Sequence, residues 1–298
     1  MSIKTKIQSL IKNPNLVIRN WFVIKLRYLY PDKLYLKLLY YLSHKRKLDL
    51  KNPQTFTEKL QWIKLYDHNP YYTKLVDKYE SKKIVDGILG EGYEFPLLGV
   101  YDRFDDIDFN TLPNQFVIKC THNCGVVICK DKNKLDIKKA RKSINKTMRN
   151  NYFYYSREWP YKNVPRKVIV EQYMEDESYE ELKDYKFFCF NGEPKLLYVA
   201  SGRGKDDTRF DFFDTNFNHL DIINGHPNAD SPIKKPENFD KMVLIATKLS
   251  QGLKEVRIDL YNINGRIYVG EFTFFHMGGI VPFEPIEWDY ELGRYVKL

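Results

Sequence analysis

Two acidic side chains near the end of the chain have the spacing of a metal site. Residues 255–261 and 266–273 are two runs rich in β-branched and aromatic residues, and the turn between them ends in Asn-Gly, so they predict a β-hairpin. Closing this hairpin brings Asp259 of the first run close to Glu271 of the second. Two carboxylates on one sheet face repel each other unless a cation lies between them. Oxygen ligands of this kind suit Mg²⁺ together with substrate phosphates.

The alternation of side chains determines which neighbours these carboxylates have. In the second run a period of two places Glu271 on one face with Ile267, Val269 and Thr273. We expect Arg257 and Thr273 beside the acidic pair. For an isolated hairpin the alternative is that these are ordinary solvent-facing charges, and the other motifs of the chain decide between the two interpretations.

A second group that could do chemistry is a lysine next to a tight polar loop. Residues 115–120 predict a strand that ends near Lys119, residues 121–125 a loop, and residues 126–130 a returning strand. A lysine in this place can hold a phosphate through its ammonium group while the N–H groups of the loop cover it. The sequence is not a Walker P-loop, because no Gly-Lys-Ser/Thr opens a helix.

The elements that must position these groups are a mixture of strands and helices. Further strands are predicted at 168–174 and 184–190, and a helix between residues 236 and 255 leads into the hairpin. Residues 131–165 begin with a helical pattern and then become aromatic. The aromatic part, from about residue 152 to residue 161, indicates an excursion over the site that could act as a lid.

Composition and charge exclude two classes of protein. The 298 residues are 43% hydrophobic and 29% charged, as in ordinary globular proteins. The net charge of +9 comes entirely from residues 1–50, which hold 11 Lys and Arg against 2 Asp and Glu. Because the rest of the chain is neutral, we expect no nucleic-acid partner. No apolar stretch approaches the ~20 residues that a membrane-spanning helix needs.

The basic segment 1–50 has a helical pattern in which Lys and Arg are interleaved with aromatic residues. Such a segment can make peripheral contact with an anionic membrane. The alternative is a helix packed on the body with its basic face in water. Because the N-terminus lacks the apolar core of a signal peptide, and the four cysteines form no zinc or disulfide pattern, we expect a cytoplasmic protein. Membrane contact would place it at the inner face.

From about residue 51 to residue 273 the chain resembles the ATP-grasp superfamily. Within it, the chain is most similar to the TupA-like group, which is named for teichuronopeptide synthesis and linked to bacterial surface polysaccharides. Each motif alone is weak, and their order and spacing together are specific. The motifs that carry the resemblance are 52–59, 77–79, 96–100, 117–119 with the following loop, 170–174, 184–186 with Asn191-Gly192, Arg257-x-Asp259 and Glu271-x-Thr273.

The resemblance implies an α+β protein with the ATP-grasp fold, in which two α+β lobes clasp the nucleotide. The helical basic extension would occupy residues 1–50, followed by an N-terminal α/β region over 51–113. The small lobe would span 114–175, and the large lobe with the metal site 176–298.

The resemblance also implies ATP and Mg²⁺ as cofactors and a role for each matching residue. Mg²⁺ would be held by Asp259, Glu271 and Thr273. The side chains expected to act in catalysis are Lys119, Lys186, Arg209 and Arg257. The residues expected at the nucleotide are Lys119 and the loop residues Thr121, His122, Asn123 and Gly125 near the phosphates, Glu171, Gln172, Tyr173 and Met174 at adenine, and Asp184 at the ribose. Lys78, which matches a family lysine, and Lys186 are also expected to contact the nucleotide.

Two positions depart from the family pattern. The last metal position is usually Asn, and here it is Thr273, whose neutral hydroxyl is a poorer ligand. The phosphate loop has a single glycine, Gly125, with His122 and Cys124 where small residues are usual. His122 is expected to pack or to touch phosphate, and a nucleophilic role for Cys124 is not needed by the chemistry of the family.

The reaction that the resemblance implies is an ATP- and Mg²⁺-dependent carboxylate–amine ligation through an acyl phosphate. The partner would be a glycan or sugar, with an amine or amino acid joined to a uronic acid-type carboxylate. A kinase acting on a hydroxyl of a sugar or polyol would use the same nucleotide site. A non-catalytic nucleotide-binding scaffold is the third interpretation, and the retained Asp259 and Glu271 argue against it.

Overall fold

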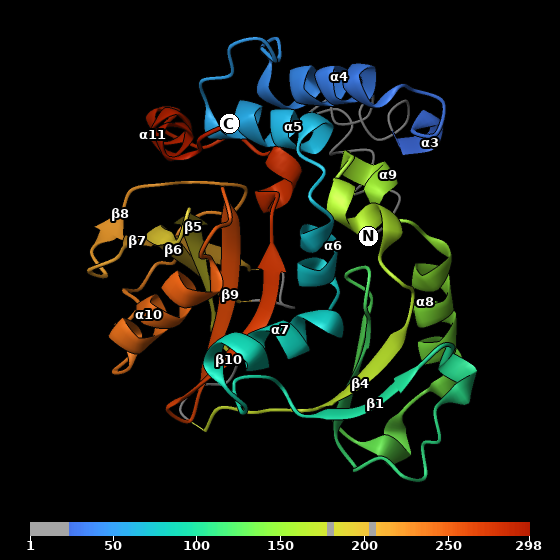
Figure 1. The fold of residues 1–298 in the computed structure, drawn as a ribbon. Coiled ribbons are helices and arrows are strands. Elements are labelled where there is room, and N and C mark those ends of the chain that lie inside the picture. Colours follow the sequence, from blue (N-terminus) through green and yellow to red (C-terminus); the bar gives the residue numbers. More distant parts are fainter. Residues whose placement is uncertain (1–23, 178–181, 203–206) are drawn as a thin grey trace.

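Two antiparallel β-sheets form the body of the protein (Figure 1). The computed structural model describes residues 24–177, 182–202 and 207–298. The four-stranded sheet, here the small sheet, has the order β1-β4-β2-β3, and the six-stranded sheet, here the large sheet, has the order β10-β9-β5-β6-β7-β8. The strands are β1 (Leu97–Tyr101), β2 (Phe116–Cys120), β3 (Val126–Cys129), β4 (Val168–Gln172), β5 (Asp184–Phe190), β6 (Glu193–Ser201), β7 (Arg209–Asp214), β8 (His219–Leu220), β9 (Val256–Ile263) and β10 (Arg266–Thr273).

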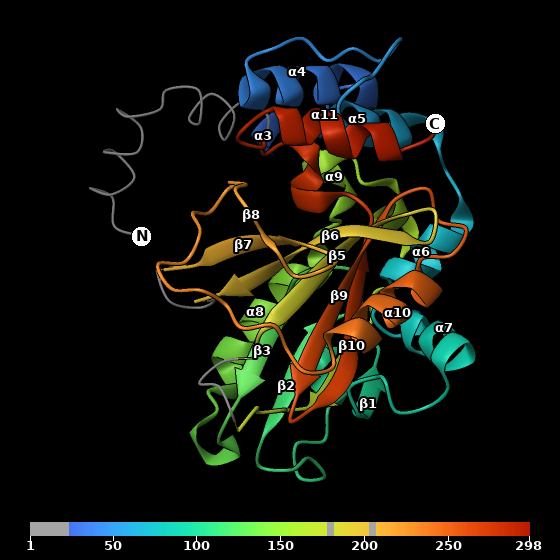
Figure 2. The ribbon, with the colours of Figure 1, turned by 90° about the vertical axis from the view of Figure 1, so that its left-hand side faces the viewer.

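Helices surround the two sheets and gather at one end of the molecule, where α4, α5 and α11 lie together (Figure 2). The α-helices are α3 (Ile24–Leu26), α4 (Asp32–His44), α5 (Phe56–Tyr66), α6 (Pro70–Val76), α7 (Glu80–Leu89), α8 (Ile137–Arg149), α9 (Phe153–Ser156), α10 (Phe239–Leu249) and α11 (Glu287–Tyr295). The 3₁₀ turns are η2 (Phe104–Asp106), η3 (Lys132–Lys134), η4 (Trp159–Asn163) and η5 (His276–Gly279).

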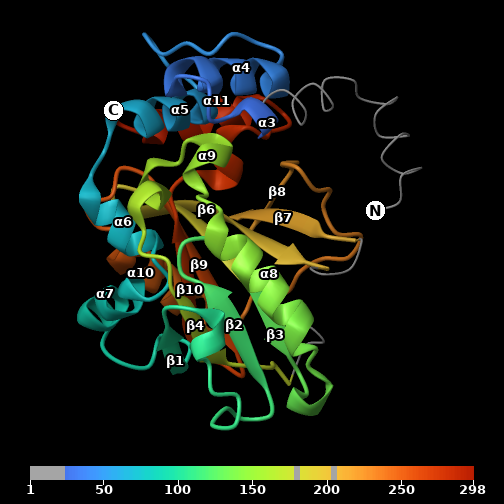
Figure 3. The ribbon, with the colours of Figure 1, turned by 90° about the vertical axis from the view of Figure 1, so that its right-hand side faces the viewer.

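The small sheet has one face in a hydrophobic core and one face free of it. Phe116 and Ile118 of β2 pack with Val168 and Val170 of β4 and with Ile144 of α8. Figure 3 shows α8 lying across β2 and β3. Because side chains alternate along a strand, the residues between these apolar ones point away from α8. That opposite face carries the charged side chains of the sheet.

The large sheet is built in the same way around α10. The apolar face of α10 packs on β5, β6 and β9, with the rings of Phe239 and Phe187 5.9 Å apart. Tyr185, Ile258 and Leu260 belong to the same core. The intervening residues of β5 and β9 therefore lie on the face away from α10.

Two short segments join the sheets. The backbone N–H of Val269 in β10 donates to the carbonyl of Tyr93 at 2.7 Å, and Glu94 forms a bridge with Val269. The chain then enters β1, which pairs with β4 in the small sheet. The second connection is at the hairpin turn, where Asn264 accepts from the N–H of Glu177 at 2.9 Å. Strand β1 therefore belongs to the small sheet, although it lies within the range 51–113.

The part of the basic extension that the structure describes packs on the body. One face of α4 is buried, with Tyr35, Leu36 and Tyr40 completely covered, whereas Leu34 and Tyr41 on the other face are exposed. The packed-helix interpretation therefore applies to α4. Residues 1–23 lie outside the described residues, and contact with an anionic membrane stays a prediction. No helix in the described ranges is long and apolar enough to cross a membrane.

Candidate functional site

The hairpin brings the two predicted carboxylates together, and it does so through a β-bulge. The register pairs Glu271 with Asp259 and Thr273 with Arg257, as the sequence predicts. Val269 pairs with Leu260, so Gly270 is an extra residue in β10. The expectation that Glu271 shares a face with Val269 is wrong, because the bulge inverts the alternation between them. Without the bulge Glu271 would point into the core beneath the sheet.

Asp259 lies at the centre of a buried ion-pair network on the face of the large sheet away from α10. Arg257 donates to both of its carboxylate oxygens, at 2.6 and 2.8 Å, and Lys186 pairs with the same group. Lys186 also contacts Asp184 at 2.7 Å. Burial alone would lower the pKa of Lys186, but Asp184 and Asp259 raise it well above its ordinary value. Both lysine and arginine are therefore held in their charged forms.

His276 holds the Arg257 guanidinium from the other side. Arg257 Nη1 donates to His276 Nδ1 at 2.8 Å, and His276 Nε2 donates to Asn224 Oδ1 at 2.8 Å. The Asn224 side chain donates in turn to the carbonyls of Val281 and Pro282. Burial, followed by the charges of Arg257 and Lys186, lowers the pKa of His276 well below its ordinary value, so the ring is neutral and can accept from arginine.

Glu271 is more open than Asp259. Its side chain is 38% exposed, and Lys78 Nζ lies 3.5 Å from its carboxylate. Arg257 is 4.0 Å from the other oxygen. Burial would raise the pKa of Glu271, but Lys78 and, more weakly, Lys186 and Arg257 lower it overall despite the nearby Asp259. Glu271 is therefore an ionised carboxylate with room for a further ligand.

A second network of charges lies on the small sheet. Lys119 Nζ contacts Glu171 at 2.5 Å, and Lys82 of α7 contacts the same carboxylate at 2.7 Å and Glu94 at 3.0 Å. Burial would raise the pKa of Glu171, but Lys119 and Lys82 together lower it. The Lys119 side chain is 26% exposed, and its ammonium group lies 5.2 Å from the centre of the Phe95 ring.

The loop after β2 is anchored at its base and open at its tip. Thr121 is fully buried and its hydroxyl donates to the carbonyl of Pro165 at 2.7 Å, so it holds the loop rather than facing the site. His122 is buried as well, and burial lowers its pKa. A Cβ on Gly125 would lie 2.5 Å from the Thr147 side chain of α8, so only glycine fits there. Cys124 at the tip is exposed.

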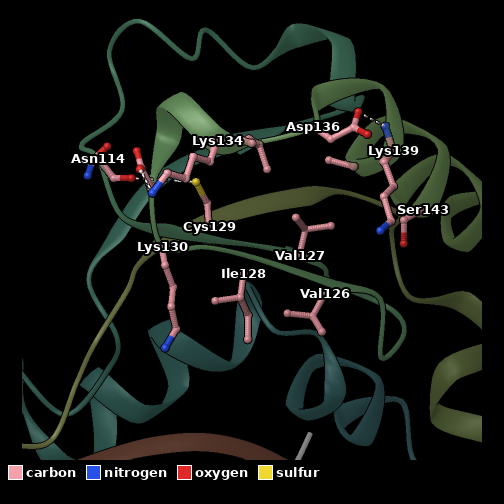
Figure 4. A pocket seen from close by; sticks show the side chains of 13 residues that line it. Asn114, Val126, Val127, Ile128, Cys129, Lys130, Lys134, Asp136, Lys139 and Ser143 are labelled. Carbon is pink, nitrogen blue, oxygen red and sulfur yellow. Dashed lines mark hydrogen bonds and ion pairs between the residues drawn. The ribbon is translucent and has the colours of Figure 1, made fainter.

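The apolar side chains of β3 extend the small sheet's charged face into an open surface. Val126 pairs with Lys119 and Ile128 with Val117, and these two β3 residues are 48% and 57% exposed. Figure 4 shows Ile128 and Lys130 on the side of β3 away from Lys139 of α8. The face that carries Lys119 is therefore bordered by exposed β-branched side chains.

Of the four residues expected at adenine, Glu171 and Gln172 end β4, and Tyr173 and Met174 follow it. Gln172 donates its backbone N–H to the carbonyl of Pro96 at 2.9 Å and points its side chain to the surface. The ring of Tyr173 lies 5.4 Å from Lys130 Nζ. Met174 packs against the buried cluster of Phe95, Ile263 and Tyr268.

One cavity joins the predicted metal group to the predicted phosphate loop. It has a volume of about 180 Å³ and is open to solvent. Its walls come from four separate parts of the chain. They are Lys78 after α6, Asn123 and Cys124 of the loop, Tyr152, Glu158 and Tyr161 of the aromatic excursion, and Arg257, Glu271, Thr273, Phe275, Met277 and Gly278 of the hairpin and the segment after it.

A protein-family model agrees with this arrangement. The model described as TupA-like ATPgrasp matches residues 58–297. The chain belongs to the TupA-like ATP-grasp family. The family therefore supplies the fold of this protein, with two α+β lobes around a nucleotide cleft. No curated protein matches the chain significantly.

Solved structures similar to this TupA-like protein include two D-alanine–D-alanine ligases. The enzyme from Bacillus anthracis, complexed with ATP, has a TM-score of 0.41 and 19% identity over 67% of this chain and 53% of its own. That from Helicobacter pylori has a TM-score of 0.43 and 14% identity over 81% and 69%. An L-amino acid ligase from Bacillus licheniformis has a TM-score of 0.45 and 11% identity over 85% and 57%. The TupA-like chain thus spans little more than half of the first and third.

Arg209 lies apart from the other residues named from the sequence. Arg209 is the first residue of β7, where it pairs with Ser201 of β6. Its position in the ladder places it on the face of the large sheet opposite Asp184 and Lys186. Its guanidinium donates to Asp207 at 2.9 Å and to the carbonyl of Asn228 at 3.1 Å. The structure does not bring Arg209 to the cavity, and we do not carry it into the proposed function of the TupA-like protein.

The oxygen donors of the hairpin fit Mg²⁺ that arrives with a nucleotide. Two carboxylates and one hydroxyl are hard oxygen ligands, and Mg²⁺ usually takes one or two carboxylates and completes its shell with water and phosphates. Both oxygens of Asp259 are already held by Arg257, and Thr273 accepts from Arg257 at 3.2 Å. Among the described residues no three His, Cys, Asp or Glu side chains gather as a metal site.

Glu158, His276 and Tyr198 lie close to Arg257 and are not predicted as site residues from the sequence. Tyr198 of β6 packs with its ring centre 5.7 Å from the Arg257 guanidinium. These residues come from segments that are far apart in the sequence, so spacing carries no signal for them. The only available hint was the aromatic excursion around Glu158.

Proposed function

We propose that this TupA-like protein is an ATP- and Mg²⁺-dependent carboxylate–amine ligase that acts through an acyl phosphate. The acid substrate is a uronic acid-type carboxylate of a bacterial surface polysaccharide, and the second substrate is an amine or amino acid. Membership of the ATP-grasp family supports the use of ATP, and the residues that line the cavity support the proposal that the reaction takes place there.

The cavity of about 180 Å³ is the observation that carries the proposal. It places Asn123 and Cys124 of the phosphate loop against Arg257 and Glu271 of the hairpin, with Lys78 beside them. A triphosphate that lies under the loop therefore has its terminal phosphate next to cationic groups and a carboxylate. Phosphoryl transfer depends mainly on such positioning and charge neutralisation.

Each residue then has a physical task. Arg257 and Lys78 attract the γ-phosphate and the substrate carboxylate, two anions that repel each other. His276 and Asp259 hold the Arg257 guanidinium on both sides and keep it pointed into the cavity. Asp259, Glu271 and Thr273 would hold Mg²⁺, which neutralises charge on the phosphate oxygens when bound.

The small sheet supplies the remainder of the nucleotide site. Lys119 lies beside the exposed Val126 and Ile128, which offer an apolar surface to the base. Asp184 accepts from Tyr261 at 3.2 Å and pairs with Lys186, and we assign it to the ribose. The aromatic excursion forms part of the cavity wall, where it would help to keep out water that hydrolyses an acyl phosphate.

Product analysis tests the proposal. The full chain is incubated with ATP, Mg²⁺, D-glucuronate or an oligoglucuronate, and a panel of amino acids and amines. We expect equal amounts of ADP and free phosphate, and a product whose mass is that of acid plus amine less one water. Glu271→Gln should abolish turnover, whereas Glu287→Gln on the exposed surface of α11 should retain it. ADP release with a phosphorylated sugar and no free phosphate would contradict the ligase and identify a kinase.

A further inference from the structure

The cavity is lined by two chemically different groups of side chains. Lys78 and Arg257 lie near Glu271, so this group suits an anion. Glu158 lines the same cavity with Tyr152 and Tyr161, whose ring centres are 5.0 Å apart. A carboxylate beside aromatic faces attracts a cation, since ring quadrupoles and the negative charge act in the same direction. The proposed acid-activation chemistry uses only the first group.

Glu158 is deeply buried and only partly satisfied. It is 3% exposed, and Ser156 Oγ donates to its Oε1 at 2.5 Å. No other residue in the described ranges donates a hydrogen bond to it or lies within ion-pair distance. Its second oxygen is therefore available to the cavity that it lines. An ionised carboxylate in such a place is costly unless a cation completes it.

Two buried cations act on Glu158, but neither forms an ion pair with it. Lys64 is 2% exposed, and its Nζ donates to the carbonyl of Gly278 at 2.6 Å. Lys64 and Arg257 both act on two buried carboxylates, Glu158 and Glu255. Burial raises the pKa of Glu158, and Lys64, Ser156 and Arg257 only partly oppose this. A carboxyl with a raised pKa is a better proton acceptor than an ordinary glutamate.

We propose that Glu158, with Tyr152 and Tyr161, binds the ammonium group of the second substrate and takes its proton. This inference rests on the proposed function and names the nucleophile's class, a primary amine that is protonated in solution. A neutral hydroxyl would leave the Glu158 charge without a partner. The site therefore selects an amine over an alcohol at the position where the activated carbonyl is attacked.

The step balances as follows. One proton moves from the ammonium to Glu158 Oε2, which leaves a neutral amine with a free electron pair. The amine nitrogen forms a bond to the carbonyl carbon of the acyl phosphate, and the bond from that carbon to the phosphate oxygen breaks. Phosphate leaves with the electron pair and carries the second amine proton, and Glu158 returns its proton to solvent.

Cys124 provides a probe of this site that needs no substrate. It lines the same cavity and is the exposed cysteine, whereas Cys120, Cys129 and Cys189 are buried. Cationic aminoethyl methanethiosulfonate and anionic sulfonatoethyl methanethiosulfonate react with the same thiolate, so the ratio of their rates reports local charge. We expect Glu158→Gln to lower this cationic-to-anionic ratio on the order of ten-fold at low salt. Glu158→Asp should retain most of it, and Glu287→Gln should leave it unchanged.

An unchanged ratio in Glu158→Gln, with modification at Cys124 verified by mass spectrometry, would overturn the inference. Should Glu158→Gln fail to fold, the salt dependence of the wild-type protein provides a second test. Its cationic-to-anionic ratio of modification rates at Cys124 should fall as the salt concentration rises. A ratio that does not change with salt would also overturn the inference.

Turnover separates this inference from the proposed function. Hydroxylamine is largely uncharged at neutral pH and needs no base. Glu158→Gln should lose on the order of a hundred-fold in rate with an amine substrate and retain its rate with hydroxylamine. If Glu158→Gln lost the same rate with both nucleophiles, Glu158 would not be the acceptor of the ammonium proton. If the wild type ligates nothing but the Cys124 ratio changes, the proposed function fails and the ammonium site stands.

Discussion

Gly270 determines which face of the large sheet carries Glu271. It is the extra residue of the bulge between Val269 and Glu271. A Cβ at this position would lie 2.7 Å from the Tyr261 ring and 3.2 Å from the carbonyl oxygen of Asp259. The bulge therefore needs glycine because the backbone of β10 approaches its partner strand closely.

Substitution of Gly270 tests whether the bulge positions the carboxylate. Gly270→Ala should destabilise the protein by about 1–3 kcal/mol through overpacking and should weaken nucleotide binding, because Glu271 moves with the strand. Gly87→Ala in α7 is the matched control, since nothing lies within 4 Å of its added Cβ. That control should be neutral or stabilising by about 0.5–1 kcal/mol. Thermal unfolding and calorimetric titration measure both effects, and unchanged nucleotide binding in Gly270→Ala would contradict the role of the bulge.

At the residue scale the sequence predicted pairs that lie on adjacent strands. Asp259 and Glu271 meet because a short turn fixes their register, and this is visible in a single sequence. The bulge was not predicted, because one glycine in a strand pattern does not reveal where the ladder slips. His276 and Glu158 reach Arg257 and the cavity through tertiary packing, for which the sequence holds no local signal.

At the element scale, α4 shows how the extension is attached to the body of the protein. His44, at its end, stacks on Tyr40 with ring centres 4.1 Å apart and hydrogen bonds to the carbonyl of Gly279 at 3.2 Å. Gly279 lies in η5, next to Gly278 on the cavity wall. Burial is the main cause that lowers the pKa of His44 from 6.5 to about 4.

This shift predicts a pH dependence of stability. Between pH 6.5 and about pH 4 the unfolded chain binds a proton at His44 and the folded protein does not, so the free energy of unfolding falls as pH falls. His44→Gln keeps a hydrogen-bond donor to Gly279 but cannot titrate. The slope of the free energy of unfolding against pH should therefore decrease by the equivalent of about one proton, which amounts to ~1–3 kcal/mol between pH 6.5 and about pH 4. Denaturant titrations at a series of pH values measure it. His219→Gln, at an exposed site, is the control, and identical slopes for wild type and His44→Gln would refute the assignment.

The strands of the small sheet could be predicted because alternation and turns mark them. Three strands form where the sequence predicts them: β2, β3 and β4. Their spatial order could not be predicted, since β1 pairs with β4 and not with β2, its neighbour in sequence. Strand order depends on how α8 and the joining segments pack, and these contacts span long distances along the chain.

At the scale of the whole molecule, two sheets carry separate charge networks, and we propose that the nucleotide binds between them. Lys119 and Glu171 belong to the small sheet, and Arg257, Asp259 and Glu271 to the large sheet. The sheets are joined by the segments around Tyr93 and Asn264 at one end of the hairpin. Because each network is neutralised internally, a highly charged nucleotide must bring its own cation to bind between them.

Calorimetric titration with a non-hydrolysable ATP analogue tests this central claim most directly. Wild-type protein should bind the analogue with Mg²⁺, should bind it much more weakly with EDTA, and should give no heat with Mg²⁺ alone. Glu271→Gln should weaken the Mg²⁺-dependent binding on the order of ten-fold or more, because it removes the open carboxylate. Glu287→Gln should bind as the wild type does. Equal affinity of wild type and Glu271→Gln for the analogue with Mg²⁺ would contradict a nucleotide site at this hairpin.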